Sequence, residues 1–326
     1  MHKQTEIDRI QKERYKIMAY KATETGWKIF RMFLLVGLSF VLLYPIIYMI
    51  VMAFRPPEDI YDPTVIWISN SLTLENITNA LKLMDYSNSI RNTLFINIGS
   101  SVMQVVVCSM TGYAFARFQF KGKTLMFFVV LFTIVVPPQI ISTPSYINFQ
   151  FFDFFGIASL AQVFGIHIKV SLIDSVWAFY LPAMLGAGLK SGLFVFLFRQ
   201  FYRGLPKELE DAAAIDGCGF GSCYVRIMIP NALSVIITSL ILSGAWYWND
   251  YFTSSMYMNT KLTITPSLLN LETESKMLYG MNISDPYKII TLLQAGCLLT
   301  ILPLIIAYIV LQRFLVKGFA NSGIVG

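Results

Sequence analysis

Six long apolar stretches constrain the fold of this chain more than any other feature. About 20 consecutive apolar residues are enough to cross the hydrocarbon core of a bilayer as a helix. Only 13% of the 326 residues are charged, which is about half the share found in soluble domains. The sequence therefore predicts an all-α membrane protein with six transmembrane helices, at residues 30–54, 93–116, 124–147, 176–201, 231–252 and 289–315.

The positions of Lys and Arg predict the orientation. Basic residues are concentrated in segments 1–31, 117–123, 199–230 and 313–317, which all lie on one side if the chain crosses six times. Loops that are rich in Lys and Arg stay in the cytoplasm. We therefore expect a multi-pass protein of the bacterial cell membrane with both termini in the cytoplasm. Residues 1–29 are expected to form a cytoplasmic arm and not a cleaved signal peptide, because the first apolar stretch is long enough to span.

A polar stretch from Leu205 to Pro230 lies between two of the apolar segments. Pro206 suits the first position of a helix, and the acidic residues after it suit the positive end of the helix dipole. Gly217 is expected to end this helix, and a second short helical run follows. The sequence thus predicts a helix, a bend and another helix outside the membrane, with one narrow face of small and aliphatic side chains, Leu205, Leu209, Ala212 and Ala213.

This stretch resembles the EAA loop of the membrane subunits of binding-protein-dependent ABC importers. The resemblance rests on the spacing of Asp211-Ala212-Ala213, Gly217 and the Ile227 to Pro230 segment. It implies the permease fold of that family over residues 30–326, with a cytoplasmic coupling loop at 203–230 that docks in a cleft of an ATPase subunit. Asp211 replaces the usual Glu, which shortens its reach by about one methylene. The residues implied in coupling are Glu208, Asp211, Ala212, Ala213, Asp216, Gly217 and Pro230.

Three further segments resemble the same family in the same order. The basic turn from Gly112 to Lys123 is similar to a short hairpin of the family, and residues 312–326 are similar to the end of its carbohydrate-importing, maltose-type members. Trp248-Asn249-Asp250 resembles a signature of those members, which implies a sugar or oligosaccharide as the substrate. Aromatic residues at an outer boundary also form interfacial belts, so both readings stay open for Trp246, Trp248, Asn249 and Asp250.

Two of the apolar stretches carry residues that are unusual in a membrane helix. Lys190 lies within the fourth, where an ammonium group is costly unless it is solvated or paired. It either lines the substrate pathway, pairs with a carboxylate of a partner subunit or reaches a headgroup. The third stretch carries Pro137, Pro138 and Pro144, which predicts a broken helix. The Phe-rich outer loop that follows it is an insertion relative to the family, at about 156–171, and we assign it no function.

The resemblance also implies an assembly. The expected partners are a second, homologous permease, two ATP-binding subunits, an extracellular solute-binding protein, the sugar and membrane lipid, with no nucleic acid. This chain is expected to be a transport subunit and not an enzyme, with ATP and Mg on the partner subunits and no cofactor of its own. Gly122-Lys123-Thr124 is no phosphate-binding loop, because Arg117 stands where its first glycine would be. Two distant histidines, His2 and His167, and four scattered cysteines predict no metal or catalytic site.

Three alternative functions compete with sugar import. A non-sugar solute such as a peptide, polyamine or anion is compatible with the EAA-like loop. A gradient-driven secondary transporter would show internal repeats and ionisable residues deep in several spans, whereas only Lys190 lies well inside one. A membrane-embedded enzyme would need a cluster of His, Asp or Glu residues.

Overall fold

The computed structural model describes residues 2–62, 69, 71–153, 156, 170–279 and 286–322. Within these ranges the regular elements are helices, apart from an isolated antiparallel bridge between Phe152 and Val170. The predicted all-α class is therefore confirmed. The insertion expected at 156–171 lies outside the described residues except for Gly156, Val170 and Ser171.

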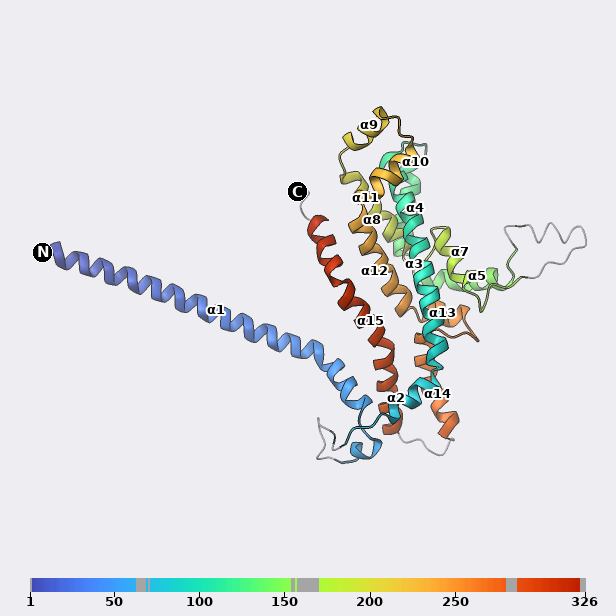
Figure 1. Cartoon of the computed structure of the whole chain (residues 1–326), viewed down its shortest axis with the longest axis horizontal. Helices are drawn as coiled ribbons and strands as arrows, with labels where there is room; N and C mark the ends of the chain where they lie inside the picture. The colour runs from blue at the N-terminus through green and yellow to red at the C-terminus, as the bar shows by residue number, and fades with distance from the viewer. Residues whose placement is uncertain are drawn as a thin grey trace, which may run out of the picture.

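The first helix, α1 (His2–Ala53), is continuous and projects away from the rest of the molecule (Figure 1). It passes the expected boundary between arm and membrane domain, at residue 29, without a break. Among the side chains of α1 whose burial the structure describes, from residue 18 onward, only those of the last turns are buried: Met49, Met52 and Ala53 lie in the core next to α15 (Pro286–Ser322). In the most apolar window of its span, Thr23–Ala53, only 6% of residues are buried within the chain.

Helix α3 (Tyr86–Arg117) is the centre of the bundle and contacts α7, α8 and α12. Small residues let these helices approach closely, as is common between membrane helices. At Gly112 a Cβ atom would lie only 2.5 Å from the Cβ of Phe198 on α8 (Ser191–Gly204). At Gly99 it would meet the hydroxyl of Tyr180 on α7 (Trp177–Met184). The buried side of α3 is half polar and includes Ser100, Ser101, Gln104 and Ser109. Helix α12 (Leu233–Asn249) packs against α3.

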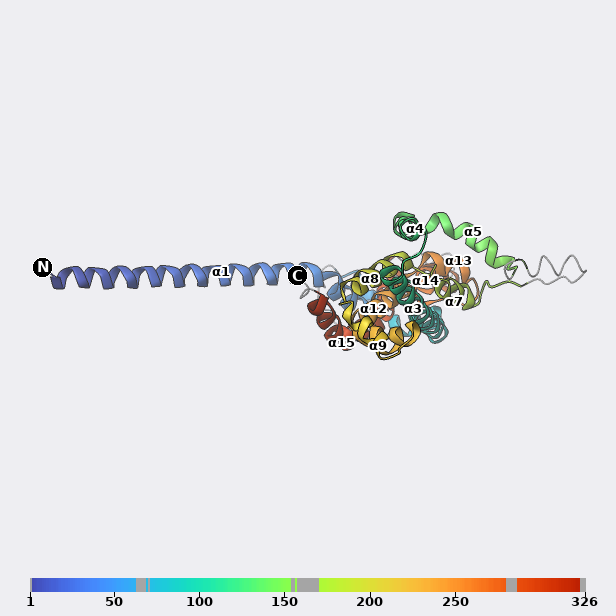
Figure 2. The ribbon, with the colours of Figure 1, turned by 90° about the horizontal axis from the view of Figure 1, so that it is seen from above.

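Two of the six predicted spans are interrupted. The third is split into α4 (Lys123–Val135) and α5 (Pro138–Gln150), which meet at an angle of 99°. Pro137 and Pro138 explain this break, because neither can donate a helical hydrogen bond. Figure 2 shows α4 and α5 along one side of the bundle. The fourth, expected as one helix over 176–201, is instead α7 and α8 with a non-helical loop between them.

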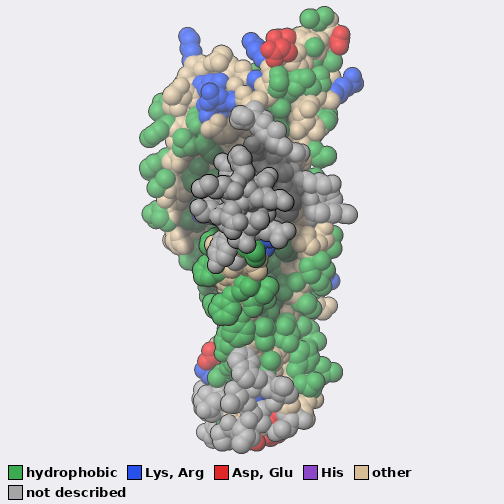
Figure 3. Space-filling view, turned by 90° about the vertical axis from the view of Figure 1, so that its left-hand side faces the viewer, with side chains coloured by type: hydrophobic (Ala, Val, Ile, Leu, Met, Phe, Trp, Pro, Cys, Tyr) green, Lys and Arg blue, Asp and Glu red, His purple; other side chains and the backbone are tan. Residues whose placement is uncertain are grey.

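The described residues contain three to five candidate membrane spans, compared with the six predicted. Three described helices are long and apolar enough to cross a membrane: Thr23–Ala53, Tyr86–Arg117 and Ile289–Gln312. Two bent pairs, α4 with α5 and Phe220–Asn231 with Leu233–Asn249, raise the count to five if each is one span. The structure is thus a multi-pass helical protein. Figure 3 shows hydrophobic side chains over its middle, with most of the visible charged side chains towards the two ends.

The two ends of the bundle are built differently. At one end lie η1 (Pro57–Ile60), α2 (Glu75–Leu83) and α14 (Ile264–Tyr279), while the short helix α13 (Phe252–Tyr257) lies nearer the middle, in contact with α5 (Figure 1). The other end carries the polar loop that follows α8. This loop contains α9 (Glu208–Ile215), α10 (Phe220–Cys223), a π-helical turn η3 (Tyr224–Met228) and α11 (Ile229–Asn231). Helix α9 forms the tip of the molecule at this end (Figure 1).

Candidate functional site

The predicted helix, bend and helix is present at the tip. Helix α9 ends at Ile215, and Gly217 adopts a φ of 79°. The N–H of Cys218 donates to the carbonyl of Ala213 at 2.9 Å, and the N–H of Gly217 donates to that of Ala214 at 3.1 Å. This pair of bonds is the Schellman motif, in which a left-handed glycine satisfies the last carbonyls of a helix. Gly217 therefore ends α9 for a defined conformational reason.

The predicted face of small side chains is divided between the bundle and solvent. Ala213 is buried against the bundle, and Leu205 and Leu209 are half-buried beside it. Ala212 is exposed, together with Asp211 and with Ile215, which is 86% exposed. The other residues expected in coupling, Glu208, Asp216, Gly217 and Pro230, are also exposed. The exposed surface of α9 thus includes Asp211, Ala212 and Ile215.

Sequence reasoning missed the inward-facing acid of α9. The Glu210 carboxylate accepts a hydrogen bond from the hydroxyl of Tyr113 at 2.8 Å, and its second oxygen lies 3.1 Å from Nε of Arg117. Both partners belong to the last two turns of α3. The signal in the sequence was the Arg117 that closes α3, but nothing in the spacing showed that it meets a residue 93 positions further along the chain.

The π-helical turn η3 lies against the same part of α3. The Tyr224 ring lies 5.0 Å from the Tyr113 ring, and its hydroxyl donates to Ser109 at 2.9 Å. Ser109 also shares a hydrogen bond with the hydroxyl of Tyr202 on α8, at 2.8 Å. Such π-turns are rare and occur mostly at functional sites. The helical loop at the tip is therefore joined to α3 and α8 by a buried aromatic and hydroxyl cluster.

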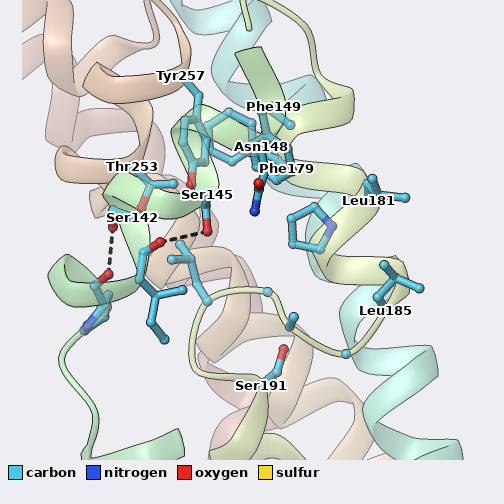
Figure 4. A pocket seen from close by; sticks show the side chains of 18 of the residues that line it. Ser142, Ser145, Asn148, Phe149, Phe179, Leu181, Leu185, Ser191, Thr253 and Tyr257 are labelled. Carbon is cyan, nitrogen blue, oxygen red and sulfur yellow. Dashed lines mark hydrogen bonds between the residues drawn. The ribbon is translucent and has the colours of Figure 1, made fainter. Parts of the chain in front are cut away.

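A cavity of about 670 Å³ lies between the α4–α5 bend and the break between α7 and α8. Aromatic rings of Phe149, Phe179 and Tyr257 form one part of its wall (Figure 4). Hydroxyl and amide groups from α5 and α13 also line it, namely Ser142, Ser145, Asn148 and Thr253. In Figure 4 the Asn148 side chain points toward the middle of the cavity. The wall thus combines apolar rings with groups that form hydrogen bonds.

The loop between α7 and α8 is the part of the wall that carries Lys190. Gln104 of α3 donates to the carbonyl of Leu189 at 2.5 Å, and the N–H of Leu189 donates to the hydroxyl of Tyr247 at 3.4 Å. Lys190 adopts a φ of 57° and is the N-cap of α8, so it lies at a helix break and not inside a helix as expected. Its side chain is exposed at the cavity. Tyr247 and Gln104, which hold this loop, were not singled out from the sequence.

The other residues expected in the pathway do not line this cavity. Trp248 is 7% exposed, and its indole N–H donates to the carbonyl of Thr300 on α15 at 3.2 Å. The Asp250 carboxylate accepts the backbone N–H groups of Thr253 and Ser254, at the start of α13. The Trp246 ring packs on Phe194 at 5.2 Å, and Asn249 donates to the carbonyl of Ala245. In this chain these four side chains contact their own helices and neighbours, whereas Tyr247 between them faces the cavity.

Comparison with known proteins shows the family to which this chain is related. The family of binding-protein-dependent transport system inner membrane components matches residues 104–321. An arabinooligosaccharides transport system permease protein of Halalkalibacterium halodurans is 30% identical over 294 residues, covering 89% of this chain and 93% of that protein. An alpha-glucoside transport system permease protein of Rhizobium meliloti is 27% identical over 257 residues, covering 78% and 60%.

The fold has a relative among solved structures. A chain in the crystal structure of a bacterial ABC transporter involved in the import of the acidic polysaccharide alginate superposes with a TM-score of 0.69. It is 20% identical and covers 89% of this chain and 97% of that chain. The family match spans most of the chain and includes the helical loop at the tip and the loop that carries Lys190. The chain therefore belongs to the family of inner membrane components of binding-protein-dependent transport systems and is a permease subunit of an ABC importer.

Proposed function

We propose that this permease imports a sugar or oligosaccharide, as one of two homologous membrane subunits that enclose the pathway. The observation that carries the proposal is the cavity beside Lys190. Aromatic rings can stack on the C–H faces of a sugar, while hydroxyl, amide and ammonium groups bind its hydroxyls. The relatives from Halalkalibacterium halodurans and Rhizobium meliloti are named for oligosaccharide and glucoside transport, which supports the same substrate class.

The pathway is assigned to the side of the chain that carries the two broken helices. Irregular backbone at membrane depth is tolerated where it lines a water-filled cavity or is buried in protein. We assign Lys190 to the wall of the pathway, and Trp246, Trp248, Asn249 and Asp250 to the support of α12 behind it. The chain crosses the membrane six times in this proposal, with α7 and α8 together as the fourth crossing. Both termini then lie in the cytoplasm with α9.

The exposed face of α9 is the docking surface for an ATPase subunit. ATP and Mg bind on two such subunits, and an extracellular solute-binding protein delivers the solute at the opposite end. This coupling loop contains Glu208, Asp211, Ala212, Ala213, Asp216, Gly217 and Pro230. Ala213 contributes by packing α9 against the bundle. Closure of the ATPase pair displaces α9 and biases the spans between inward-open and outward-open states.

The test is the ATPase activity of the reconstituted complex with its neighbouring subunits and binding protein. Arabino-oligosaccharides, α-glucosides, peptides and polyamines are added in turn. Stimulation by one of the sugars is the expected result. Stimulation by peptides or polyamines alone would leave an importer whose substrate is not a sugar.

Two charge reversals separate docking from folding. Asp211→Lys changes an exposed acid in the first turn of α9, and Glu24→Lys changes an exposed acid on α1, away from α9 and from the end assigned to the binding protein. We expect the first to lower solute-stimulated ATPase activity and the second to leave it unchanged. Equal activity in both variants would reject α9 as the docking surface.

A further inference from the structure

Helix α9 is attached to the bundle by few contacts. Along the helix only Ala213 is buried, and Leu209 and Glu210 are half-buried. The remaining side chains of α9 are exposed. A displacement of this helix therefore reaches the bundle either through this narrow face or through the chain at its two ends.

The polar contact on this face is shielded from water. The side chains of Arg117 and Glu210 expose only 13% and 17% of their surface. An ion pair at such a site is screened less than an exposed pair, so its partners attract each other more strongly. Arg117 also donates through Nη2 to the carbonyl of Leu205 at 2.8 Å. One guanidinium thus holds both the segment that enters α9 and the helix itself.

The second partner of Glu210 belongs to a packed block. Tyr113 is 5% exposed, and its ring lies 5.4 Å from that of Tyr202 and 5.0 Å from that of Tyr224. Tyr113 and Arg117 are four residues apart and so lie on the same face of α3. A shift of the Glu210 carboxylate would act on the end of α3 at two points one turn apart.

Helix α3 continues from this contact to the cavity. Gln104, nine residues before Tyr113 on the same helix, is fully buried and holds the carbonyl of Leu189 next to Lys190. No break separates these positions, because α3 is continuous from Tyr86 to Arg117. One continuous helix thus has the α9 contact at one point and the cavity loop at another.

We propose that Tyr113, Arg117 and Glu210, here called the α3–α9 joint, are positioning residues that pass the movement of α9 to α3 and so to the loop at Lys190. This inference rests on the proposed docking of α9 on an ATPase subunit. The joint adds to that function the specific span that moves with the docking helix. It touches neither the solute nor the nucleotide and acts only through α3.

Charge reversal tests the joint. Glu210→Arg and Arg117→Glu each place like charges together, whereas the double variant restores an opposite pair in reversed order. In the reconstituted complex, with the solute that stimulates it, uptake per ATP hydrolysed should fall about fivefold or more in each single variant, the lower end of typical coupling between sites. The double variant should recover most of that loss. Glu24→Lys, in the exposed pair with Lys28 on α1, is the matched control and should change nothing.

Two milder variants decide the matter if a reversal prevents assembly. Glu210→Gln and Tyr113→Phe keep the shape of the joint and remove a charge or a hydroxyl, and co-purification of the subunits verifies assembly. Both should lower the solute-stimulated part of the ATPase activity more than the basal part. If uptake per ATP hydrolysed stays unchanged in both variants, the proposed role of the joint is rejected.

A variant of the exposed face separates failure of the joint from failure of the docking role. Ala212→Trp enlarges the surface of α9 without touching Glu210. If it uncouples uptake from hydrolysis while the joint variants do not, docking stands and the joint is rejected. If neither class of variant has an effect, the proposed role of α9 is rejected as well.

Discussion

The indole N–H of Trp248 donates a hydrogen bond to the main-chain carbonyl of Thr300, 3.2 Å away on α15. The hydroxyl of Thr265 on α14 donates in turn to the carbonyl of Trp248 at 2.9 Å. Trp248 therefore links three helices, α12, α14 and α15, at one point. In this chain the aromatic residue of the Trp-Asn-Asp segment supports the bundle behind the cavity.

The first prediction follows from this link. Trp248→Phe keeps an aromatic ring but leaves the Thr300 carbonyl without the indole N–H. The complex should lose about 1 kcal/mol of stability, the net value of one neutral hydrogen bond, while the apparent KM for uptake stays unchanged. Thermal unfolding and uptake kinetics measure the two quantities. Trp177→Phe, at a tryptophan that is 51% exposed, is the control. A raised KM with unchanged stability would instead place Trp248 in contact with the solute.

The second prediction concerns the close packing around Gly188. A Cβ atom there would lie 2.6 Å from the hydroxyl of Tyr247 and 2.8 Å from Oε1 of Gln104, so both buried groups would have to move. Gly188→Ala should reduce uptake and destabilise the complex by about 1–3 kcal/mol, as overpacking does. The loss should be smaller when Tyr247→Phe is added, because the nearest atom is then absent. Gly204→Ala, in open space, is the control.

Equal losses with and without Tyr247→Phe would contradict this account of Gly188. The comparison is a double-mutant cycle, in which neighbouring residues that share a contact deviate from additivity. Thermal unfolding supplies the stability terms, and initial uptake rates supply the functional terms. The cycle therefore reports on the loop that presents Lys190 to the cavity.

The third prediction uses the left-handed conformation of Gly217. No neighbouring atom lies within 4 Å of a Cβ built there, so only the backbone opposes a side chain. A left-handed non-glycine residue costs about 1–2 kcal/mol, and β-branched residues tolerate this region least. Gly217→Val should therefore uncouple uptake from ATP hydrolysis without preventing membrane insertion, and Gly217→Asn should be milder. Normal uptake per ATP in Gly217→Val would count against the coupling role.

The fourth prediction concerns pH and the loop before α7. Burial alone would raise the pKa of the Asp174 carboxyl, but the N–H groups of Asn259 and Thr260, at 2.6 and 2.8 Å, more than offset it. The folded pKa thus lies below the unfolded value of about 3.9. The resulting stability is present above that value and is lost as pH falls through the folded pKa.

Thermal unfolding of the native complex and of an Asp174→Asn variant checks this sign. The native complex should be the more stable of the two by a constant margin from about pH 7 to pH 5, and the margin should shrink below about pH 4. The control is Glu274→Gln, at an exposed acid on α14 that belongs to neither the coupling loop nor the cavity wall. A margin that grows as the pH falls would contradict the role of the carboxylate.

The helices were predictable where apolar length decides the outcome, as in α3 and α15. The bend between α4 and α5 was predictable for a chemical reason, because Pro137 and Pro138 lack the N–H that a helix needs. The split between α7 and α8 was not predicted, although Gly186 adopts a φ of 71° there and lies just before Gly188. Apolar glycine-rich sequence is compatible with both a close helix contact and a break. Only the packing of Tyr247 and Gln104 decides between them.

The candidate site likewise has features that the sequence predicts and features that only the folded structure reveals. The end of α9 at Gly217 follows from local backbone preference and could be read from the sequence. The inward turn of Glu210 could not, because it depends on Arg117, which folding brings to it from far along the chain. The same holds for Trp248: its neighbours in the sequence describe a motif, but its role depends on Thr300 of another helix.

The weak attachment of α1 bears on how the chain enters the membrane. Lipid tails solvate apolar side chains as well as a protein core does, so this helix needs no partner within the chain to be stable there. The broken helices α4, α5, α7 and α8 differ, since their freed backbone groups must be satisfied by neighbouring protein. During synthesis α1 can therefore leave the translocon first and tether the nascent chain to the bilayer. The interrupted segments then emerge beside a chain that is already held at the site where they must assemble.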